Sequence, residues 1–391
     1  MKYDQAFFDA GIDRSGTNSV KWAASGIMQE GMVPLWVADM DFACATPIVD
    51  ALKERAKHAC FGYTFPGEED AQAFIGFWKR RHKLDLRRPW LVMMPTVVTG
   101  LRACVQTMTQ PGDGVIIQTP VYGPFINAIL ESGRQVLDAP LKHDEQGRYT
   151  MDYEAVEKHL RNGARLMMFC NPHNPVSRAW SQEELRALLC LLNRYNCKLV
   201  SDEIHADFVY FPREFYPVLS LPEARQDTVM LTAASKTFNV AGLLQSTAVC
   251  RDRDIVMMLK RYLDRSGASC GNIFALAGTR AAFNHCDDWL DSLMVYLQSN
   301  QELLGETLKE LLPHAVLSPM EATYLAWVDI RAYCEPSCDV TSRCKKHGVA
   351  LTNGQFFGES TGQGFMRINY GCPRGQLMEG MQRFAHAIKE G

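Results

Sequence analysis

Neither sign of charge dominates this chain of 391 residues, because 41 basic and 44 acidic side chains leave a formal net charge of -3. That balance gives no general reason to bind nucleic acid or an anionic membrane. The one basic cluster, residues 79–88, contains Asp85 and precedes Pro89, and we interpret it as the solvated end of a helix. No helix-turn-helix pattern is present either, so we expect no nucleic-acid partner.

Long hydrophobic runs are also missing. No run approaches the roughly 18 to 20 apolar residues that a membrane-spanning helix needs. The first stretch, residues 1–14, has acidic residues near its start and no continuous apolar segment of signal-peptide length. We therefore expect a soluble protein that is not exported and has no membrane partner.

Paired cysteines are absent from a chain that has many cysteines. The thirteen cysteines are odd in number and scattered, with no C-x-x-C pair. This pattern argues against a disulfide framework and against a zinc site, and we predict no metal site. A reducing cytoplasm is the natural compartment for such a protein.

The length exceeds the size at which a single hydrophobic core keeps growing, which predicts two domains. Strand-like and helix-like segments alternate from about residue 90 to residue 250. Such alternation predicts an α/β fold, with a mostly parallel central sheet sandwiched by helices on both faces.

Three polar residues follow predicted strands of this sheet. Asn174 comes just past residues 166–170, Asp202 just past residues 198–200, and Lys236 a few residues past a β-rich run that ends at Leu231. Ligands bind beyond the carboxyl ends of the strands in an open parallel sheet, so these three side chains can converge on one crevice.

A lysine at the end of a buried strand is costly, because burial disfavours its charged form. Condensation of the amine with an aldehyde removes that charge, and pyridoxal phosphate is the usual aldehyde in enzymes. An isolated Ser-Lys pair would more simply be a surface lysine after an edge strand. The neighbouring Asn174 and Asp202 favour the chemical interpretation.

The spacing of these motifs resembles a known superfamily. NPHNP at 171–175 is followed by DEIH, whose Asp202 lies 28 residues after Asn174, and by SKTFN, whose Lys236 lies 34 residues after Asp202. This arrangement resembles the fold-type I aminotransferases that use pyridoxal phosphate. Further motifs resemble the cystathionine β-lyase branch of carbon-sulfur lyases within that superfamily: WVADMDF at 36–42, FGYT at 61–64, TPVYGPF at 119–125 and RINYGCPR at 367–374.

The resemblance covers essentially the whole chain and implies the fold-type I architecture. Residues 1–45 would form an N-terminal arm and part of a small domain. Residues 46–285 would form the large domain that binds the cofactor, and residues 286–391 the smaller α+β domain. It also implies a homodimer with shared active sites.

The resemblance further implies roles for the residues at the strand ends. Lys236 would hold the cofactor's aldehyde and later act as the general base. Asp202 would pair with the pyridine nitrogen, and Asn174 would donate a hydrogen bond to the phenolic oxygen. His205 would lie near the same oxygen, although a packed loop histidine is an equally good interpretation of this residue.

The cofactor's phosphate and ring are expected to meet a second group of residues. A helix that begins near Thr99 would direct the backbone N–H groups of Val97 and Val98 at the phosphate. By resemblance, Ser235 would also bind the phosphate, Tyr63 would reach it from the neighbouring subunit, and Tyr122 would stack on the pyridine ring.

The substrate carboxylate is expected to meet Arg367, whose planar guanidinium suits bidentate pairing. A structural salt bridge is the alternative for this residue. By resemblance, the backbone of Val37 and Ala38 would face the same carboxylate. The nearby Asp39 and Asp41 could form a metal or acid pair, but capping and turn formation before the helix that follows are the favoured interpretation.

Three departures from the family pattern bear on the activity. Leu244 replaces an arginine that aminotransferases use on the phosphate, and Ala233 replaces a serine with a similar role. Gly123 replaces an aromatic residue, which would leave more room near the leaving group. We therefore expect a carbon-sulfur β-lyase acting on cystathionine, cysteine or related cysteine S-conjugates. An aminotransferase, or a regulatory protein that binds a protein partner, are the alternatives.

Overall fold

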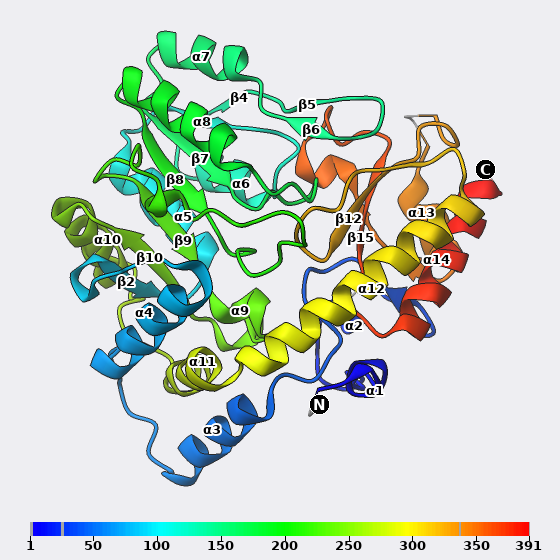
Figure 1. Cartoon of the computed structure of the whole chain (residues 1–391), viewed down its shortest axis with the longest axis horizontal. Coiled ribbons are helices and arrows are strands. Elements are labelled where there is room, and N and C mark those ends of the chain that lie inside the picture. The colour runs from blue at the N-terminus through cyan, green and yellow to red at the C-terminus, as the bar shows by residue number, and fades with distance from the viewer. Residues whose placement is uncertain (1–2, 25–26, 336–337, 391) are drawn as a thin grey trace.

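The computed structural model describes residues 3–24, 27–335 and 338–390. Its centre is a seven-stranded sheet with the strand order β2-β10-β9-β8-β7-β3-β4 (Figure 1). Neighbouring strands from β9 to β4 are parallel, and β10 is antiparallel to both of its neighbours. The mostly parallel sheet predicted from the sequence is thus confirmed, with one reversed strand. The strands are β2 (Leu91–Met94), β3 (Gly114–Ile117), β4 (Gln135–Asp138), β7 (Leu166–Cys170), β8 (Lys198–Asp202), β9 (Val229–Thr232) and β10 (Ser246–Cys250).

Both faces of this sheet are buried, which explains why its strands read as continuous apolar runs. In β7, Leu166 and Met168 face one hydrophobic core, and Met167 and Phe169 face the other, because successive side chains of a strand point to opposite faces. The first core is covered by α5 (Val97–Met108), α6 (Pro124–Leu130) and α10 (Arg253–Arg265). The other is covered by α4 (Glu68–His82), α7 (Tyr153–Arg161), α8 (Gln182–Arg194) and α11 (Ile273–His285).

Helix α8 begins where capping chemistry predicts. Ser181 caps α8, since its hydroxyl accepts a hydrogen bond from the Glu184 N–H at 3.2 Å, and the Glu184 carboxylate accepts one from the Ser181 N–H at 2.8 Å. This reciprocal capping box satisfies two N–H groups that the helix itself leaves free. At the end of α4, Lys79 pairs with Asp85 on the exposed surface, which agrees with the predicted solvated helix end.

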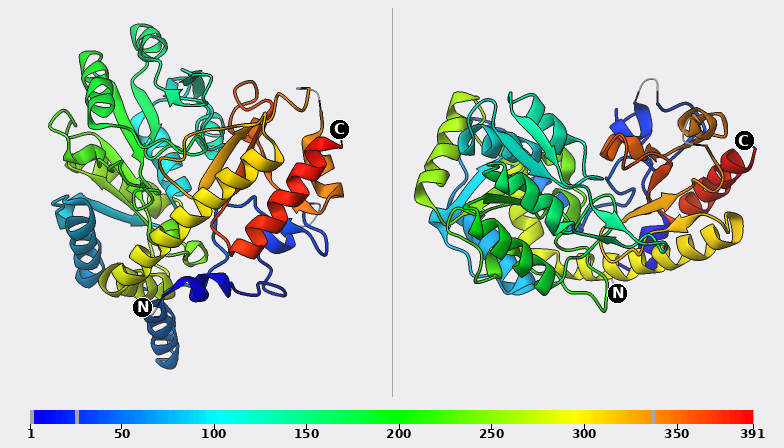
Figure 2. Two further views of the ribbon diagram at one scale, coloured as in Figure 1. Left: turned by 45° about the vertical axis from the view of Figure 1, so that its right-hand side comes forward. Right: turned by 90° about the horizontal axis from the view of Figure 1, so that it is seen from above.

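A second, smaller sheet lies at the other end of the long helix α12 (Asp287–Leu311), which extends between the two sheets (Figures 1 and 2). Its strand order is β11-β12-β15-β14, and all of its pairings are antiparallel. Helix α14 packs beside α12 and α13. These elements are β11 (Val316–Leu317), β12 (Leu325–Asp329), β14 (Thr352–Asn353), β15 (Phe365–Asn369), α13 (Val340–Lys346) and α14 (Arg374–Lys389).

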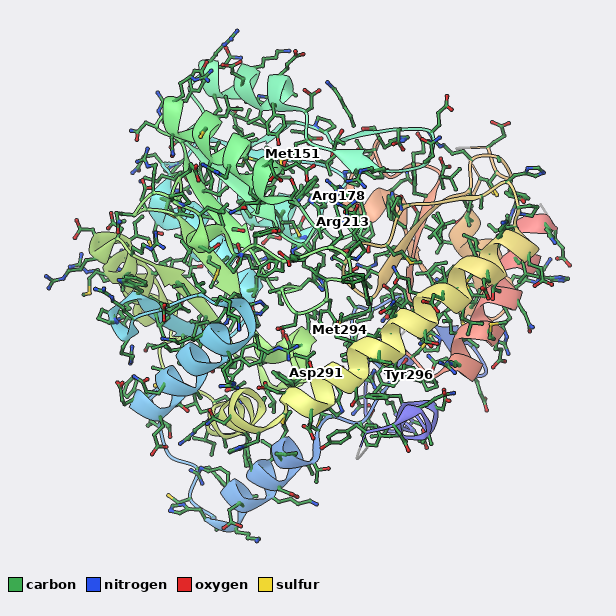
Figure 3. All side chains as sticks on the ribbon, viewed as in Figure 1. Met151, Arg178, Arg213, Asp291, Met294 and Tyr296 are labelled. Atoms are coloured by element: carbon green, nitrogen blue, oxygen red, sulfur yellow. The ribbon has the colours of Figure 1, made fainter. Side chains whose placement is uncertain are left out.

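Ion pairs join the segment before β12 to the large sheet's loops. Arg178 and Arg213, both labelled in Figure 3, pair with the carboxylate of Glu321. Arg148 pairs with the same carboxylate at 2.7 Å. Because Glu321 is buried, these three partners offset the cost of removing its charge from water.

The N-terminal segment lies against the second sheet and α12. Strand β1 (Val33–Pro34) pairs in parallel with β13 (Val349–Ala350). Helix α1 (Gln5–Asp9) packs on α12, where the hydroxyl of Tyr296, labelled in Figure 3, donates to the Asp9 carboxylate. Residues 1–2 and 25–26 of the predicted arm lie outside the described residues. Short elements complete the chain: α2 (Val20–Ala23), α3 (Thr46–Lys57), α9 (Ala234–Thr237), β5 (Lys142–His143) and β6 (Tyr149–Thr150).

Asp39 and Asp41 lie in bends before the next helix, in agreement with the predicted turn, but the prediction that they cap this helix is wrong. Helix α3 starts at Thr46 after Ala45, and no side chain caps it. Asp41 instead pairs with Lys21 at 2.7 Å and with Arg14 at 2.8 Å. The carboxylates neutralise buried cations from earlier in the chain, which a local capping pattern cannot show.

No helix in the described part of the chain is both long and apolar enough to cross a membrane.

Candidate active site

A cavity of about 350 Å³ opens beyond the carboxyl ends of β7, β8 and β9. Every residue that the sequence predicted for the site, except Tyr63, lines it. The predicted residues brought together there are Val37, Ala38, Val97, Val98, Tyr122, Asn174, Asp202, His205, Ser235, Lys236 and Arg367. The cavity at the carboxyl ends of these parallel strands is thus lined by residues from the whole length of the chain. Ligands bind at this edge in an open α/β sheet.

Lys236 lies in α9, one short turn after β9. Its Nζ donates a hydrogen bond to the carbonyl oxygen of Ala38 at 2.6 Å. Burial lowers the pKa of this amine to about 8, with Asp39 opposing the shift and Arg367 adding to it. A substantial neutral fraction near pH 8 makes the amine a competent nucleophile and base.

Asp202 ends β8 at the floor of the cavity. Its Oδ1 accepts a hydrogen bond from the Ile204 N–H at 3.1 Å, and burial raises its pKa to about 7. A buried carboxyl of this kind gains most from a cationic partner such as a protonated pyridine nitrogen.

Arg367, in β15, is buried, and its guanidinium is shared among several acceptors. Its Nη1 donates to the Asn174 Oδ1 at 3.2 Å, and its Nη2 donates to the Trp36 carbonyl at 2.6 Å. Burial lowers its pKa to about 10, and within the described chain its Nε has no hydrogen-bond partner. No carboxylate pairs with Arg367 in the described chain, so the structural salt bridge considered from the sequence is not found. The group is left to bind an anion that enters the cavity.

His205 is both packed and exposed to the cavity, so the two interpretations of this residue are compatible. Its ring meets Tyr324 edge-on at 5.9 Å and Phe208 at 6.3 Å. Burial, with help from Lys236, lowers its pKa to about 3, so the imidazole is neutral. Its Nδ1 has no hydrogen-bond partner among the described residues, which leaves one polar atom for a ligand.

The N-terminus of α5 offers a place for a phosphate. The Thr96 hydroxyl caps the helix by accepting from the Thr99 N–H at 3.0 Å. The hydrogen bonds found among the described residues leave the N–H groups of Val97 and Val98 unused. Together with the Ser235 hydroxyl, these donors and the helix dipole favour an anion.

Gly123 does not leave additional room, contrary to the expectation from the sequence. A Cβ atom at this position would lie 2.8 Å from the Phe356 carbonyl oxygen and 3.1 Å from its ring. Phe356 lines the cavity, with its ring 6.2 Å from that of Tyr122. The aromatic surface is therefore supplied by a short 3-10 helix, Gly354–Phe357, that is distant in the sequence, and the glycine makes space for it.

Tyr63 lies outside the cavity of its own chain and is 97% exposed. Phe61 and Phe65 beside it are also exposed, at 59% and 67%. Three exposed aromatic residues in one short loop form a surface suited to contact with another molecule.

The sequence analysis missed the residues that hold the turn carrying Ala38. Lys21 is fully buried and bonds both the Asp41 carboxylate and the Asp39 carbonyl. Asn239 donates to the carbonyl oxygens of Met40 and Phe42 at 2.9 and 2.8 Å. Asn239 belongs to the SKTFN motif and could have been noticed. Lys21 stands in a mixed polar stretch that gives no such signal.

A buried network behind Lys236 was also missed. The His82 Nε2 and the Thr237 hydroxyl both meet the Asp207 carboxylate, at 2.9 and 2.6 Å. Burial alone would raise the pKa of Asp207, but these two partners hold it below its usual value. Since Thr237 follows Lys236 directly, the network fixes the turn that presents the amine.

The donors in the cavity fit the cofactor that the sequence resemblance implies. A lysine with a lowered pKa suits an aldehyde, and a buried carboxyl suits a pyridine nitrogen. The free N–H groups of α5 suit a phosphate.

Comparison with known proteins agrees with the family that the sequence motifs resemble. The family model "Aminotransferase class I and II" matches residues 30–384. Cystathionine beta-lyase PatB of Bacillus subtilis is 37% identical over 97% of this chain and 99% of its own length. Protein MalY of Escherichia coli is 30% identical over 98% of both chains.

A solved structure shares nearly the whole fold. Cystalysin of Treponema denticola, which contains a pyridoxal 5'-phosphate cofactor, superposes with a TM-score of 0.92 at 30% identity, covering 100% of both chains. A family model that spans most of the sequence and relatives that align end to end leave one assignment: this chain belongs to the class I and II aminotransferase family.

Proposed function

We propose that this protein is a pyridoxal-phosphate-dependent carbon-sulfur β-lyase. Its substrates would be L-cystathionine, L-cysteine or related cysteine S-conjugates, and its products pyruvate, ammonia and a thiol. The observation that carries the proposal is one cavity in which Lys236, Asp202 and Arg367 converge. Relatives named cystathionine β-lyase align over nearly the whole chain and support the reaction class.

Bound pyridoxal phosphate would supply the electron sink for the substrate's α-carbon. Asp202 would keep the pyridine nitrogen protonated, and Asn174 and His205 would face the phenolic oxygen. The N–H groups of Val97 and Val98, with Ser235 and Tyr63 of a second subunit, would hold the phosphate. Tyr122 would lie against the ring.

Arg367 would bind the substrate carboxylate. Its Nε lacks a partner in the described chain, so the guanidinium can turn a second donor toward an incoming carboxylate. The turn at Val37 and Ala38 borders the same part of the cavity. These contacts would place the substrate's α-carbon, which carries a single proton, within reach of Lys236.

Lys236 would carry the proton of the reaction. Its Nζ, with a pKa lowered to about 8, would accept the proton from the substrate's α-carbon. Loss of the thiolate from the β-carbon then completes α,β-elimination. The Ala38 carbonyl, which accepts from Nζ at 2.6 Å and from the Tyr324 hydroxyl at 2.9 Å, would hold the amine in position.

The proposed active assembly is a homodimer. The loop with Phe61, Tyr63 and Phe65 exposes aromatic side chains that a second copy would cover. A location in the cytoplasm stays a prediction, and the odd number and scattered positions of the thirteen cysteines support it.

An aminotransferase is the second candidate, and the family description favours it. Leu244 counts against it, because this half-exposed side chain lines the cavity where an arginine would add charge beside the phosphate.

The deciding experiment incubates the pyridoxal-phosphate-loaded protein with L-cystathionine and no keto acid, while pyruvate and free thiol are measured together. We expect equal release of both products, lost in Lys236→Ala and retained in Lys57→Ala, whose lysine is exposed. Product formation that waits for an added keto acid would identify an aminotransferase instead.

A further inference from the structure

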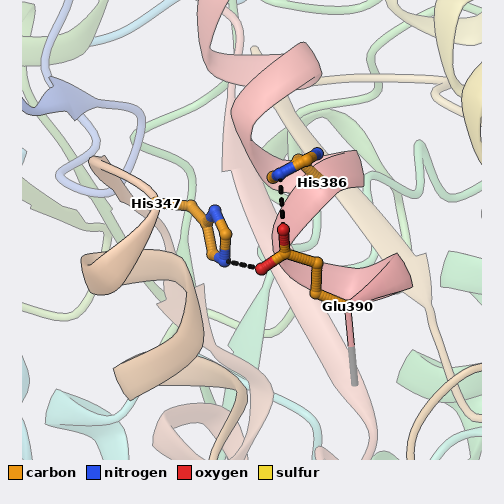
Figure 4. Close-up of side chains that lie close together, drawn as sticks. All are labelled: His347, His386 and Glu390. Carbon is orange, nitrogen blue, oxygen red and sulfur yellow. Dashed lines mark ion pairs between the residues drawn. The ribbon is translucent and has the colours of Figure 1, made fainter.

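Two histidines and a glutamate meet at the C-terminal end of the chain, on the surface of the second sheet's helices. The His347 Nε2 lies 2.9 Å from one carboxylate oxygen of Glu390, and the His386 Nε2 lies 2.7 Å from the other (Figure 4). One ligand atom from each residue lies within 4.8 Å of the other two. The Glu390 carboxylate thus holds the two ring nitrogens close together, one at each of its oxygens.

Rigid elements hold all three side chains. His386 and Glu390 are four residues apart at the end of α14, so they project from the same face of the helix. His347 caps the end of α13, where its N–H bonds the Arg343 carbonyl, and β13 follows it directly. Because α13 packs on α14, the distance between the histidines is fixed before any ligand arrives.

The ligand atoms select a particular class of cation. Two imidazole nitrogens and one carboxylate oxygen suit zinc and its late first-row neighbours, whereas magnesium and calcium prefer oxygen ligands alone. Ligands in a tetrahedral zinc site lie about 3.3 to 3.5 Å apart. The two nitrogen-oxygen distances, which run to different oxygens of the carboxylate, would open by about 0.5 Å, and the widest separation among the three ligand atoms, which lie within 4.8 Å of one another, would close to the same range.

The surroundings leave the position open to water and to a cation. The side chains of His386 and Glu390 are 63% and 49% exposed, so water can complete the coordination. The nearby Arg383 already donates hydrogen bonds from its Nη1 to the carbonyl oxygens of Gly31 and Gly348, so its guanidinium is held by other groups than the three proposed ligands. None of the three ligand residues lines the active-site cavity.

We propose that His347, His386 and Glu390 form a binding site for a divalent transition metal of the zinc class, which joins α13 to the end of α14. The metal takes the place of the hydrogens between the imidazoles and the carboxylate. The sequence pattern predicted no metal site, because His347 lies far along the chain from His386 and Glu390 and none of the three is a cysteine.

The test uses the cofactor-loaded protein without a polyhistidine tag. Zinc affinity and stoichiometry are measured by competition with a chromophoric chelator, in the wild type, His347→Gln, His386→Gln and Glu390→Gln. His58→Gln, at an exposed position on the end of α3, is the matched control. Thermal unfolding is recorded for each protein with zinc chloride and with a chelator.

We expect one more zinc ion per chain in the wild type and in His58→Gln than in the three site variants, or at least tenfold weaker zinc binding in those variants. Zinc should raise the melting temperature of the wild type and of His58→Gln but not of the three site variants, since a ligand stabilises the state that binds it. Equal zinc binding in all five proteins overturns the proposal. So does a loss of stability in the site variants that is the same with zinc and with chelator, which would identify a hydrogen-bonded ion pair only.

Discussion

At the residue scale, Lys236 combines an ordinary side chain with an unusual environment. Its amine is removed from water and placed against the carbonyl of Ala38, with the charged Arg367 nearby. Each of these features follows from the position of the residue in the fold, and each affects the pH at which the amine becomes neutral. The pKa of about 8 is therefore a property that a kinetic experiment can measure.

The rate at which the cofactor-free protein takes up pyridoxal phosphate should rise about tenfold for each pH unit below 8 and level off above it. Only the neutral amine attacks an aldehyde, and a pKa lowered to about 8 brings neutrality within this range. Stopped-flow absorbance measures the rate, with Lys236→Ala as the blank. A rate that still climbs steeply at pH 10 would show an unshifted lysine.

Leu244→Arg should slow the loss of cofactor during dialysis by about tenfold or more, because a hydrogen bond to a charged group contributes about 1.5 to 3 kcal/mol. Leu244 already has a φ of 57°, so replacing it with arginine, another non-glycine residue, adds no new backbone strain. Residual cofactor absorbance after dialysis provides the measurement. Leu244→Gln, a long neutral side chain, is the control, and equal retention by the two variants would contradict the charge argument.

At the element scale, the turn between β1 and α3 is held by charges and not by caps. Asp41 and Lys21 are 1% and 0% exposed, and Trp22 and Gln376 add hydrogen bonds to the carboxylate at 2.9 and 2.8 Å. This network fixes the backbone at Ala38, on which the amine of Lys236 rests. The stability of the turn and the position of the amine are therefore linked.

Asp41→Asn should lower the free energy of unfolding by about 3 to 5 kcal/mol, because it removes the near carboxylate of the buried Lys21 and leaves only that of Asp39, at 4.0 Å. Urea unfolding followed by fluorescence measures the change. Asp85→Asn, which breaks the exposed pair with Lys79, should cost less than about 1 kcal/mol. Similar losses of unfolding free energy in both variants would show that burial of the ion pair between Asp41 and Lys21 does not increase its contribution to stability.

The same carboxylate should contribute to acid sensitivity. Burial alone would raise the pKa of Asp41, but Lys21 and the hydrogen bonds lower it below the unfolded value. Its contribution is therefore present above the unfolded pKa of about 3.9 and is lost as the pH falls through the folded value. The unfolding energy of Asp41→Asn should accordingly fall less than that of the wild type in this acid range.

At the scale of the whole molecule, the exposure of Tyr63 supports the proposed homodimer. Its side chain faces away from the cavity of its own chain, which leaves the phosphate end without the tyrosine that the family pattern places there. A second copy would supply this group and cover the aromatic loop.

A dimer of one Tyr63→Ala chain and one Lys236→Ala chain should regain about half of the wild-type activity. One of its sites would carry both defects, and the other would have Lys236 from the first chain and Tyr63 from the second. Differently tagged chains, co-expressed and purified in two steps, give the mixed dimer for assay with cystathionine. Activity no higher than that of the two parent variants would place Tyr63 outside its partner's site.

Much of this site was predictable because its chemistry follows local patterns. Asn174, Asp202 and Lys236 each follow an apolar run, and parallel strands bring their ends to one edge. The exact limits of β7 could be predicted from its apolar residues alone. The roles of Val97 and Val98 were harder to predict, since their side chains matter less than the helix start that exposes their N–H groups.

The sequence by itself determined the α/β fold class and the position of Lys236 with Asn174 and Asp202 at the strand ends. It also identified Arg367 as the residue expected to bind a carboxylate. Only the tertiary structure decided what surrounds them. It placed the Ala38 carbonyl under Lys236, Phe356 in the space beside Gly123, and three metal-binding side chains from two helices at one point. These contacts join segments far apart in the chain, so they depend on how whole elements pack and leave no periodic pattern along the sequence.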